Sequence, residues 1–561
     1  MHRSWTRVAA GLVLAFGASL AQAQTQAQVA WPDAAQVRAY AERLIDEQKL
    51  PADGPGVAVL VARGDQLLYR GARGMASIEL GVPMNPDQMF RIGSVTKQFA
   101  ATALLKLIDE GKAKLDDPLS KFLPDYPKGE SVTLRQLLNH TSGIKSYTGI
   151  PGYMGNPVRR ELSTKELLAE FKDLPADFAP GGKWAYNNSG YVLVGAVIEA
   201  ISGKPWHQYV DEVLLGPLKL SHTAYPGETR LLKGMVNGYD FDPKLGVIDA
   251  GLISMTQPHA AGALVSSVDD LWHWNLALHG GKLLSPASYA RMITPEGVAV
   301  ASNYGYGITA GKLRGEAMLQ HGGGIHGFVS SLAYLPQSQI SIVLLRNTTG
   351  PGFNMDLVSR KLGAFALGKP YAEIKPVAVP AEQLKPLQGV YALDAKQTRS
   401  LSLRDGQLFS TRSGGSPAAL IPVGADVFAF AGSVARLQIQ RDADGKVTAL
   451  KLFQDGEGEA EVWTRTGDLP ALASITLTPE QQQALIGDYA SPQLQIKIFK
   501  DERGLLQAQV PGQPAAELKA SSPVNLYLTV VDAKLDFELE QGRASQVTLL
   551  QGPARIVMKR R

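Results

Sequence analysis

A serine and a lysine three positions apart open an apolar segment, Arg91-Ile92-Gly93-Ser94-Val95-Thr96-Lys97. No glycine or proline interrupts residues 95–110, where apolar residues recur at helical spacing. On a helix, side chains three positions apart have Cβ atoms about 5–6 Å apart, so the Lys97 amine can reach the Ser94 hydroxyl. The positive end of the helix dipole favours an alkoxide there. Such a pair can act as a nucleophile, Ser94, with its base, Lys97; the alternative is a helix-capping serine followed by a surface lysine.

A second pair with the same spacing, Ser142 and Lys145, lacks the helical pattern. Serine is a common helix cap and lysine a common surface residue, so S-x-x-K occurs by chance about twice in a chain of this length. Residues 147–152 are typical of a loop, and no helical turn brings Lys145 back to Ser142. We interpret this second pair as non-catalytic.

A glycine- and asparagine-rich stretch, residues 180–191, precedes another helical pattern. It presents the Tyr186 hydroxyl and the Asn188 amide two positions apart. A tyrosine can transfer a proton when a nearby cation lowers its pKa from about 10. The alternative is a loop tyrosine that packs on apolar neighbours.

The segment His321-Gly322-Gly323-Gly324 places an imidazole beside three glycines. Glycines let the backbone approach a substrate and direct N–H groups at an oxyanion, and His321 would add a polar or cationic group. The alternative is a glycine-rich hairpin turn. In a further segment, residues 133–144, nothing requires catalysis, and we interpret His140 as a structural histidine.

Together these segments resemble the serine β-lactamase and penicillin-binding-protein-like superfamily, on its class C side. The resemblance covers about residues 31–367 and is carried by four motifs in order: residues 90–97, 137–143, 186–191 and 321–323. It implies an α/β (α+β) transpeptidase-like catalytic domain, in which helices flank an antiparallel sheet and form a helical subdomain.

The resemblance also implies the catalytic roles. Ser94 is the acylated nucleophile, and Lys97, which must be uncharged, takes its proton; burial can lower the pKa of such an amine. Tyr186 relays the proton to the leaving group and helps to activate water. The backbone N–H groups of Ser94 and Gly324 form the oxyanion hole.

Asn188, His321 and Gly323 are implied to bind substrate, and His321 departs from the β-lactamase pattern. It replaces the lysine of K-T-G, and an imidazole is neutral for much of the time near pH 7. We therefore expect substrates that are anchored by a carboxylate, such as penicillins and D-Ala-D-Ala ends, to be disfavoured. Amine- or amide-ended D-peptides and simple esters become more plausible.

The first residues are typical of a secretory signal peptide. Arg3 and Arg7 precede an apolar run over residues 8–20 and then Ala21-Gln22-Ala23, so we expect cleavage after Ala23 and export to a bacterial periplasm. The run is shorter than the roughly 20 residues of a membrane span. Removing both arginines changes the net charge from +4 to +2, which does not favour nucleic acid as a partner.

Composition also limits the chemistry. The chain has no cysteine, so it has neither disulfides nor a thiolate nucleophile. Its nine histidines form no H-E-x-x-H motif, so we expect no metal and no cofactor.

The chain divides into a signal peptide at 1–23, a catalytic domain at 31–368, a proline-punctuated linker at 369–380 and two repeats. The motif Leu387-x-Gly389-x-Tyr391 recurs 98 positions later as Leu485-x-Gly487-x-Tyr489, among short alternating strand patterns. We expect β-barrel-like domains at 381–467 and 476–561.

The sequence thus predicts an exported serine hydrolase that acts through a Ser94 acyl-enzyme on short peptide, amide or ester substrates. D-amino-acid-containing peptides are preferred, because the three-part architecture resembles that of D-aminopeptidases; a D-Ala carboxypeptidase-like activity belongs to the same prediction. The alternatives are a carboxylesterase or β-lactamase of the same fold, or a penicillin-binding sensor that does not turn over. A G-x-S-x-G nucleophile elbow is absent. The oligomeric state is not predicted.

Overall fold

The computed structural model describes residues 31–227, 231–404, 406–469, 474–491, 494–528, 533–551 and 554–561. The expected signal peptide lies outside the described residues. Within these ranges, no helix combines the length and the apolar character needed to cross a bilayer.

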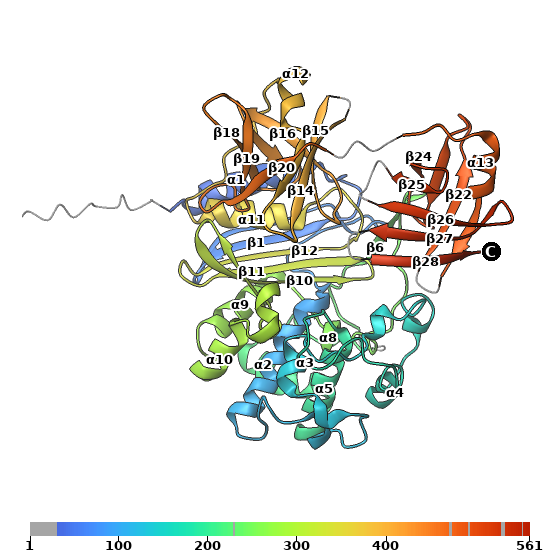
Figure 1. Cartoon of the computed structure of the whole chain (residues 1–561). Coiled ribbons are helices and arrows are strands. Elements are labelled where there is room, and N and C mark those ends of the chain that lie inside the picture. The colour runs from blue at the N-terminus through green and yellow to red at the C-terminus, as the bar shows by residue number, and fades with distance from the viewer. Residues whose placement is uncertain are drawn as a thin grey trace, which may run out of the picture.

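A six-stranded antiparallel sheet forms the centre of the first domain (Figure 1). Its order is β2-β1-β12-β11-β10-β9, and Val57 of β1 pairs with Arg346 of β12. The two ends of the domain therefore share one sheet. The strands are β1 Val57–Arg63, β2 Gln66–Arg73, β9 Thr309–Leu313, β10 Glu316–Ile325, β11 Phe328–Leu335 and β12 Ile340–Arg346.

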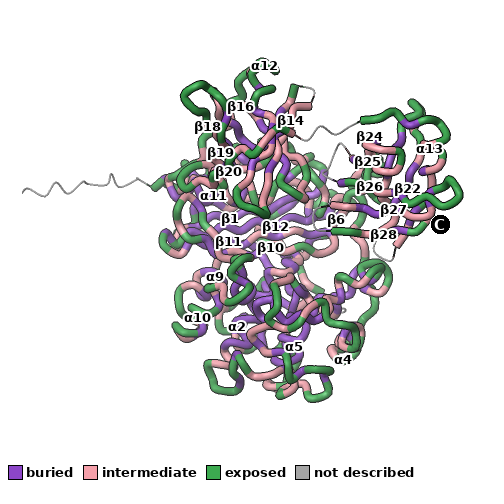
Figure 2. Tube along the Cα trace, viewed as in Figure 1, coloured by how far each residue is buried: buried purple, intermediate pink, exposed green. Residues whose placement is uncertain are grey.

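Helices cover both faces of this sheet, so its central strands are buried on both sides (Figure 2). Helices α1 (Ala34–Asp46) and α11 (Met355–Ala366) pack on one face. The other face carries the helical subdomain. Its helices are α2 Thr96–Asp109, α3 Leu134–Leu138, α4 Thr164–Ala169, α5 Asn188–Ser202, α6 Trp206–Val210, α7 Gly216–Leu218, α8 His259–Gly262, α9 Val268–His279 and α10 Pro286–Ile293.

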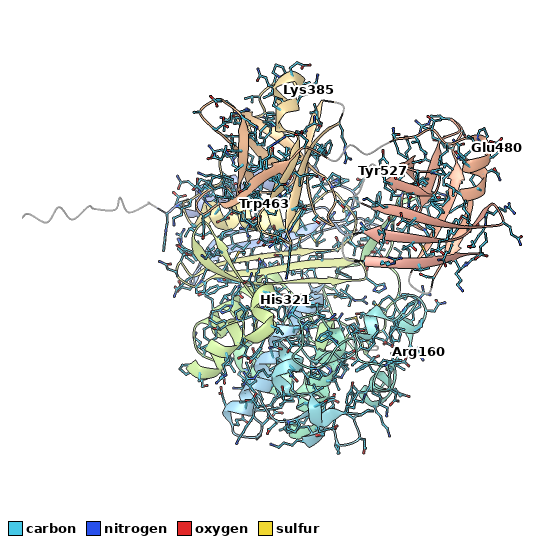
Figure 3. The ribbon with its side chains drawn as sticks, in the orientation of Figure 1. Arg160, His321, Lys385, Trp463, Glu480 and Tyr527 are labelled. Atoms are coloured by element: carbon cyan, nitrogen blue, oxygen red, sulfur yellow. The ribbon has the colours of Figure 1, made fainter. Side chains whose placement is uncertain are left out.

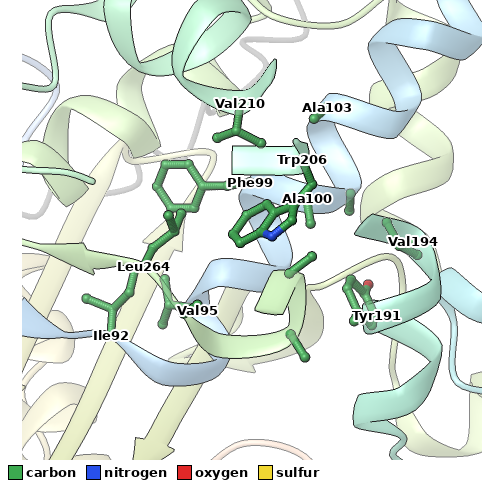
Figure 4. Close-up of a cluster of buried hydrophobic side chains, with 14 of the residues drawn as sticks. Ile92, Val95, Phe99, Ala100, Ala103, Tyr191, Val194, Trp206, Val210 and Leu264 are labelled. Atoms are coloured by element: carbon green, nitrogen blue, oxygen red, sulfur yellow. The ribbon is translucent and has the colours of Figure 1, made fainter. Parts of the chain in front are cut away.

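Helix α2 follows the Ser94 turn and is buried around its whole circumference, from residue 96 to residue 105. Phe99 stacks on Trp274 with ring centroids 3.9 Å apart. Figure 4 shows Phe99 and Ala103 of this helix beside Trp206 and Val210. Each fully buried large apolar side chain contributes about 1.5–3 kcal/mol to the stability of the fold. Helix α2 is therefore held firmly in the core and fixes the position of the Ser94 turn.

Short strand pairs complete the first domain. β5 (Phe90–Arg91) pairs with β8 (Val265–Ser266), which fixes the backbone just before Ser94. Elsewhere β3 (Met75–Ser77) pairs with β4 (Val82–Pro83), and β6 (Tyr239–Asp242) pairs with β7 (Gly246–Asp249).

Two closed eight-stranded antiparallel barrels follow, as the fold class predicted. Each begins with a short helix, α12 (Ala381–Leu384) or α13 (Pro479–Leu485). The repeated tyrosines are buried and donate equivalent hydrogen bonds, from Tyr391 to the Leu387 carbonyl (2.6 Å) and from Tyr489 to the Leu485 carbonyl (2.7 Å). The first barrel comprises β13 Gly389–Ala392, β14 Thr398–Arg404, β15 Gln407–Arg412, β16 Ala418–Gly424, β17 Val427–Phe430, β18 Arg436–Arg441, β19 Val447–Phe453 and β20 Glu461–Gly467. The second comprises β21 Gly487–Ala490, β22 Gln495–Lys500, β23 Leu506–Gln509, β24 Ala516–Ala520, β25 Asn525–Leu528, β26 Lys534–Glu540, β27 Arg543–Gln551 and β28 Ala554–Arg560.

The first barrel docks on the α1 and α11 side of the sheet (Figure 1). Asp455, in the loop between β19 and β20, accepts hydrogen bonds from the Arg360 guanidinium (2.8 Å), the Tyr371 hydroxyl and the Arg314 backbone N–H. Arg314 lies in the turn that leads into β10. The barrel therefore contacts the strand that carries His321, but from the face opposite the helical subdomain.

Candidate active site

The Ser94 hydroxyl and the Lys97 amine are in contact, with Oγ and Nζ 3.1 Å apart. Ser94 lies in a single 3-10 turn, Gly93–Val95, and Lys97 lies in the first turn of α2. The amine also lies 2.8 Å from Asn188 Oδ1 and 2.8 Å from the carbonyl oxygen of Ala261. Ala261 lies in the last turn of the short helix α8, where carbonyls lack intrahelical partners.

Burial determines the charge of Lys97. The residue is fully buried, and this desolvation holds the pKa of its amine well below 10.5. A neutral amine has two N–H donors and one lone pair. Because Asn188 and Ala261 offer only oxygen acceptors, they take the two donors, and the lone pair is left for the Ser94 hydroxyl proton. This is the arrangement of a nucleophile with its general base.

Tyr186 contacts the Ser94 hydroxyl from the end of the loop before α5. Its ring lines the open cleft, and 39% of the residue is exposed, whereas its hydroxyl is shielded beside Ser94. The expectation that a cation lowers its pKa is wrong. Lys97 lies 4.8 Å from the ring centroid but is neutral, and burial raises the pKa of Tyr186 above 10. The phenol therefore enters the reaction as a proton donor.

Strand β10 lies directly against the Ser94 turn, because glycines leave room for it. A β-carbon on Gly93, where φ is +49°, would lie 2.9 Å from the Gly324 nitrogen. A β-carbon on Gly323 would lie 2.0 Å from the Ile92 carbonyl oxygen. The segment 321–325 pairs with β11 but extends beyond the register of β9, so its other edge faces the cleft. This places the Gly324 and Ser94 backbones side by side.

His321 is buried on β10, where Figure 3 labels it, and it lines the cleft. Its Nδ1 lies 2.6 Å from the Gly322 carbonyl, which can only accept, so Nδ1 carries the hydrogen. Nε2 then accepts from the Tyr304 hydroxyl at 2.9 Å. Burial is the main cause that lowers the pKa of His321 to about 4. The imidazole is therefore neutral near pH 7, not cationic.

His140, which belongs to the motif at residues 137–143 and was expected to be structural, positions the Tyr186 loop. Its carbonyl accepts from the Ala185 N–H (3.0 Å), and its Nδ1 accepts from the Asn187 N–H (3.2 Å). Its ring lies 4.4 Å from that of Tyr186 and 4.6 Å from that of Tyr304, centroid to centroid. His140 therefore holds both backbone groups that flank Tyr186, which extends the structural role expected for it.

The second serine–lysine pair is not assembled. Ser142 is buried, and its hydroxyl accepts from the Ile144 N–H at 3.4 Å. The Lys145 amine instead pairs with Asp177 at 2.8 Å. The two side chains therefore have separate partners, and Lys145 is placed to neutralise a carboxylate.

The whole first domain matches a known protein family. The model of the family described as Beta-lactamase matches residues 41–364, which is more than half of the chain. The chain belongs to the Beta-lactamase family.

Relatives of this Beta-lactamase family member carry several activities in their names. A D-aminopeptidase from Gluconobacter oxydans is 25% identical over 57% of the chain and 61% of the relative. Esterase EstB from Burkholderia gladioli is 35% identical over 34% of the chain and 53% of the relative. The matches thus span between half and two thirds of these relatives. Among solved structures, a D-stereospecific amidohydrolase from Streptomyces sp. is 31% identical, with a TM-score of 0.50 over 56% of the chain and 95% of that structure.

None of the described residues that line the cleft of this Beta-lactamase family member is a lysine, an arginine, an aspartate or a glutamate. The cleft measures about 500 Å³ and is open to solvent along the edge of β10. In the described ranges, no group of three or more His, Asp or Glu side chains is placed to hold a metal ion. Sequence reasoning missed half of the lining, because these residues belong to none of the four motifs: Trp184, Ser302, Tyr304, Thr309, Val329 and Ser330.

Proposed function

We propose that this protein is an exported serine hydrolase that cleaves short amides and peptides of D-amino acids without a free carboxylate, through a Ser94 acyl-enzyme. The observation that carries the proposal is the neutral Lys97 amine, whose two donors are occupied and whose lone pair faces the Ser94 hydroxyl at 3.1 Å. Export is supported by the signal-peptide pattern of residues 1–23.

In the acylation step, Ser94 Oγ attacks the substrate carbonyl carbon and its proton passes to Lys97 Nζ. The carbonyl oxygen becomes an oxyanion that accepts from the Ser94 and Gly324 N–H groups. When the tetrahedral intermediate collapses, the bond to the leaving nitrogen breaks. Tyr186 gives this nitrogen a proton and regains one from the Lys97 ammonium. Because the phenol is protonated in the free enzyme, it is ready for this task.

In the deacylation step, a water attacks the acyl carbonyl. The proton of the water passes through Tyr186 to Lys97, and the second tetrahedral intermediate returns Ser94 to its hydroxyl form with a proton from the same amine. The product is a carboxylic acid. Asn188 stays between these groups because its Nδ2 donates to Thr148 Oγ1 at 3.1 Å, which leaves Oδ1 directed at Lys97.

The uncharged cleft supports the choice of substrate. No lysine or arginine lines it to pair with a free carboxylate, and His321 is neutral. Trp184 and Tyr304 offer aromatic walls to an apolar side chain. The similarity to a D-aminopeptidase and to a D-stereospecific amidohydrolase supports D-configured amides among the substrates that lack a free carboxylate.

An esterase is the second candidate. Esterase EstB has the higher identity of the two curated relatives, and a cleft without charge accepts a simple ester as well as an amide. The acylation machinery is the same for both. An ester has the better leaving group, so an esterase need not protonate it, whereas an amidase depends on the Tyr186 phenol.

A substrate panel separates these activities. D-alanine p-nitroanilide, its L-enantiomer, a D-Ala-D-Ala peptide, nitrocefin and p-nitrophenyl butyrate are assayed with wild type, Ser94→Ala and the matched control Ser142→Ala. We expect steady turnover of the D-anilide above all the others, and its loss in Ser94→Ala. Ser142→Ala removes one weak hydrogen bond and should keep at least about a tenth of the activity.

Several outcomes contradict the proposal. Turnover that survives in Ser94→Ala refutes the site assignment. A single burst of product without steady turnover identifies a penicillin-binding sensor. Preference for the butyrate ester with no anilide cleavage identifies an esterase, and preference for nitrocefin identifies a β-lactamase.

A further inference from the structure

The two barrels share one scaffold but differ on their inner faces. In each, a tyrosine near the end of the first strand pairs with an arginine of the last strand, Tyr391 with Arg465 and Tyr489 with Arg560. The strand pairing therefore relates the two barrels position by position. The first barrel carries polar and aromatic side chains at inward positions where the second is aliphatic.

Arg399 is the most deeply buried charged residue among the positions at which the two barrels differ. It pairs across the strands with the buried Tyr391, and only 9% of it is exposed. Its guanidinium donates to Ser410 Oγ at 2.8 Å and lies 4.9 Å from the Trp463 ring centroid, but its buried Nε has no hydrogen-bond partner. In the described part of the chain, no carboxylate forms an ion pair with it. A buried cation without a counter-ion is costly.

A second arginine faces the first. Arg412 of β15 is the direct cross-strand partner of Arg399, and such partners point to the same side of a sheet. Like charges opposite each other destabilise a strand pair. The Arg412 guanidinium donates to the Gln397 side chain, and none of the described carboxylates forms an ion pair with it. This end of the barrel thus presents two adjacent cations, and neither is in ion-pair contact with a described carboxylate, although the charge of Glu461 acts on Arg399.

The second barrel shows that the fold does not need these residues. By strand pairing, Ile496 takes the place of Arg399, because it pairs with Tyr489. Continuing the register gives apolar residues at four further positions on the same side of the strands. The replaced residues of the first barrel are Arg412, Ser410, Glu461 and Trp463, and their counterparts are Val510, Ala508, Ile556 and Met558.

From this juxtaposition we infer that the end of the first barrel between Arg399 and Arg412 is a binding site for a small carboxylate ligand. A guanidinium matches a carboxylate with two parallel hydrogen bonds, and Trp463 and Phe430 provide aromatic walls beside it. Glu461 acts on Arg399 as a nearby negative charge, which favours a monoanion over a phosphate dianion.

Access is possible from one side. The loops that follow β17 and β19 at this end contact the first domain through Gly432 and Asp455. In the neighbouring loops, residues 393–396, 413 and 416 are exposed. Figure 3 shows Trp463 at this end of the barrel, above the sheet. The ligand therefore enters past the exposed loops.

Isothermal titration of the full chain tests this site. The Ser94→Ala variant is used so that nothing is hydrolysed, and the test does not depend on the proposed function. The probes are N-acetyl-D-alanine, its neutral analogue N-acetyl-D-alaninamide, and inorganic phosphate. Arg399→Ile copies the second barrel, and Arg404→Ile is the matched control, with the same change at the other end of β14.

We expect N-acetyl-D-alanine to bind, the amide not to bind, and phosphate to bind more weakly. Arg399→Ile should weaken carboxylate binding at least about tenfold, and Arg404→Ile should leave it unchanged. The inference is overturned if no carboxylate binds, if the amide binds equally, if phosphate binds more tightly, or if Arg399→Ile binds as well as its parent. Should Arg399→Ile fail to fold, Arg412→Val replaces it, and unchanged binding in that variant also overturns the inference.

Discussion

Three oxygen atoms around the buried Lys97 amine orient it as a base for Ser94. Its two donors are held by Asn188 and Ala261, so the lone pair has a fixed direction toward Ser94. The same burial has a cost. Between the lowered pKa of the folded state and pH 10.5, the unfolded chain binds a proton at Lys97 and the folded chain does not. Folding must therefore release that proton.

We predict that Lys97→Met stabilises the fold while it removes activity. Methionine fills a similar volume without a proton to release, so the free energy of unfolding at pH 7 should rise. In wild type this free energy should increase as pH rises toward 10.5, because the unfolded state binds the extra proton. Lys97→Met should lack this slope and should lose about 10²–10⁴-fold in turnover. Urea unfolding at several pH values, with a turnover assay, measures both effects.

The pH dependence of kcat/KM gives a separate test. Activity needs the neutral amine, so it should fall as pH decreases through the lowered pKa of Lys97, and full activity should already be present well below pH 10.5. Lys97→Arg, which stays protonated at every accessible pH, should be inactive throughout. An activity limb near pH 10.5, or an active Lys97→Arg enzyme, would show that Lys97 is not the base.

Among single residues, the sequence predicted the side chains of the S-x-x-K and Y-x-N motifs as site residues, but it did not predict all the groups that form hydrogen bonds in the site. Ala261 acts through its carbonyl, and a backbone group has no residue type to signal it. Tyr304 lies 17 positions before His321, with no pattern that links the two. Both contacts exist only because the fold brings α8 and the segment before β9 to the site.

Among the elements, β10 and the Ser94 turn depend on each other. The glycines at 322–324 were compatible with either an oxyanion strand or a hairpin turn. The structure places them within β10, and the turn follows at Gly327. Which alternative applied could not be predicted, since it depends on pairing with β11 and on the close approach of Gly93.

We predict that Gly93→Ala impairs turnover without unfolding the protein. A β-carbon there would lie 2.9 Å from the Gly324 nitrogen, so β10 must move away from Ser94. Losing one oxyanion donor typically costs about 10²–10³-fold in turnover. Gly111→Ala is the matched control, because Gly111 also has a positive φ (+75°) but no atom within 4 Å of an added β-carbon. Turnover and circular dichroism of both variants make the comparison. If Gly93→Ala and Gly111→Ala turn over equally fast, the close approach at Gly93 does not shape the oxyanion hole.

On the scale of the whole molecule, a polar contact that could not be predicted from the sequence joins the first barrel to the catalytic domain. Asp455 lies 141 positions from Arg314 and 95 from Arg360. The repeats predicted that barrels exist, because a motif recurs within each. Their docking depends on single residues in unrelated loops, and no local pattern encodes that.

We predict that Asp455→Ala loosens the first barrel from the sheet. Arg360 is 17% exposed in its side chain, and with Tyr371 and the Arg314 N–H it would lose its acceptor, at about 1–3 kcal/mol. Urea unfolding and protease cleavage in the 369–380 linker should both report the change.

Glu373→Gln is the control, since its pair with Arg43 is more than half exposed and contributes at most about 1 kcal/mol. Because no described barrel residue lines the cleft, turnover in Asp455→Ala should stay within about threefold of wild type, a change of less than 1 kcal/mol in the barrier. Identical unfolding and cleavage in the two variants would mean that apolar contacts, not Asp455, hold the barrel.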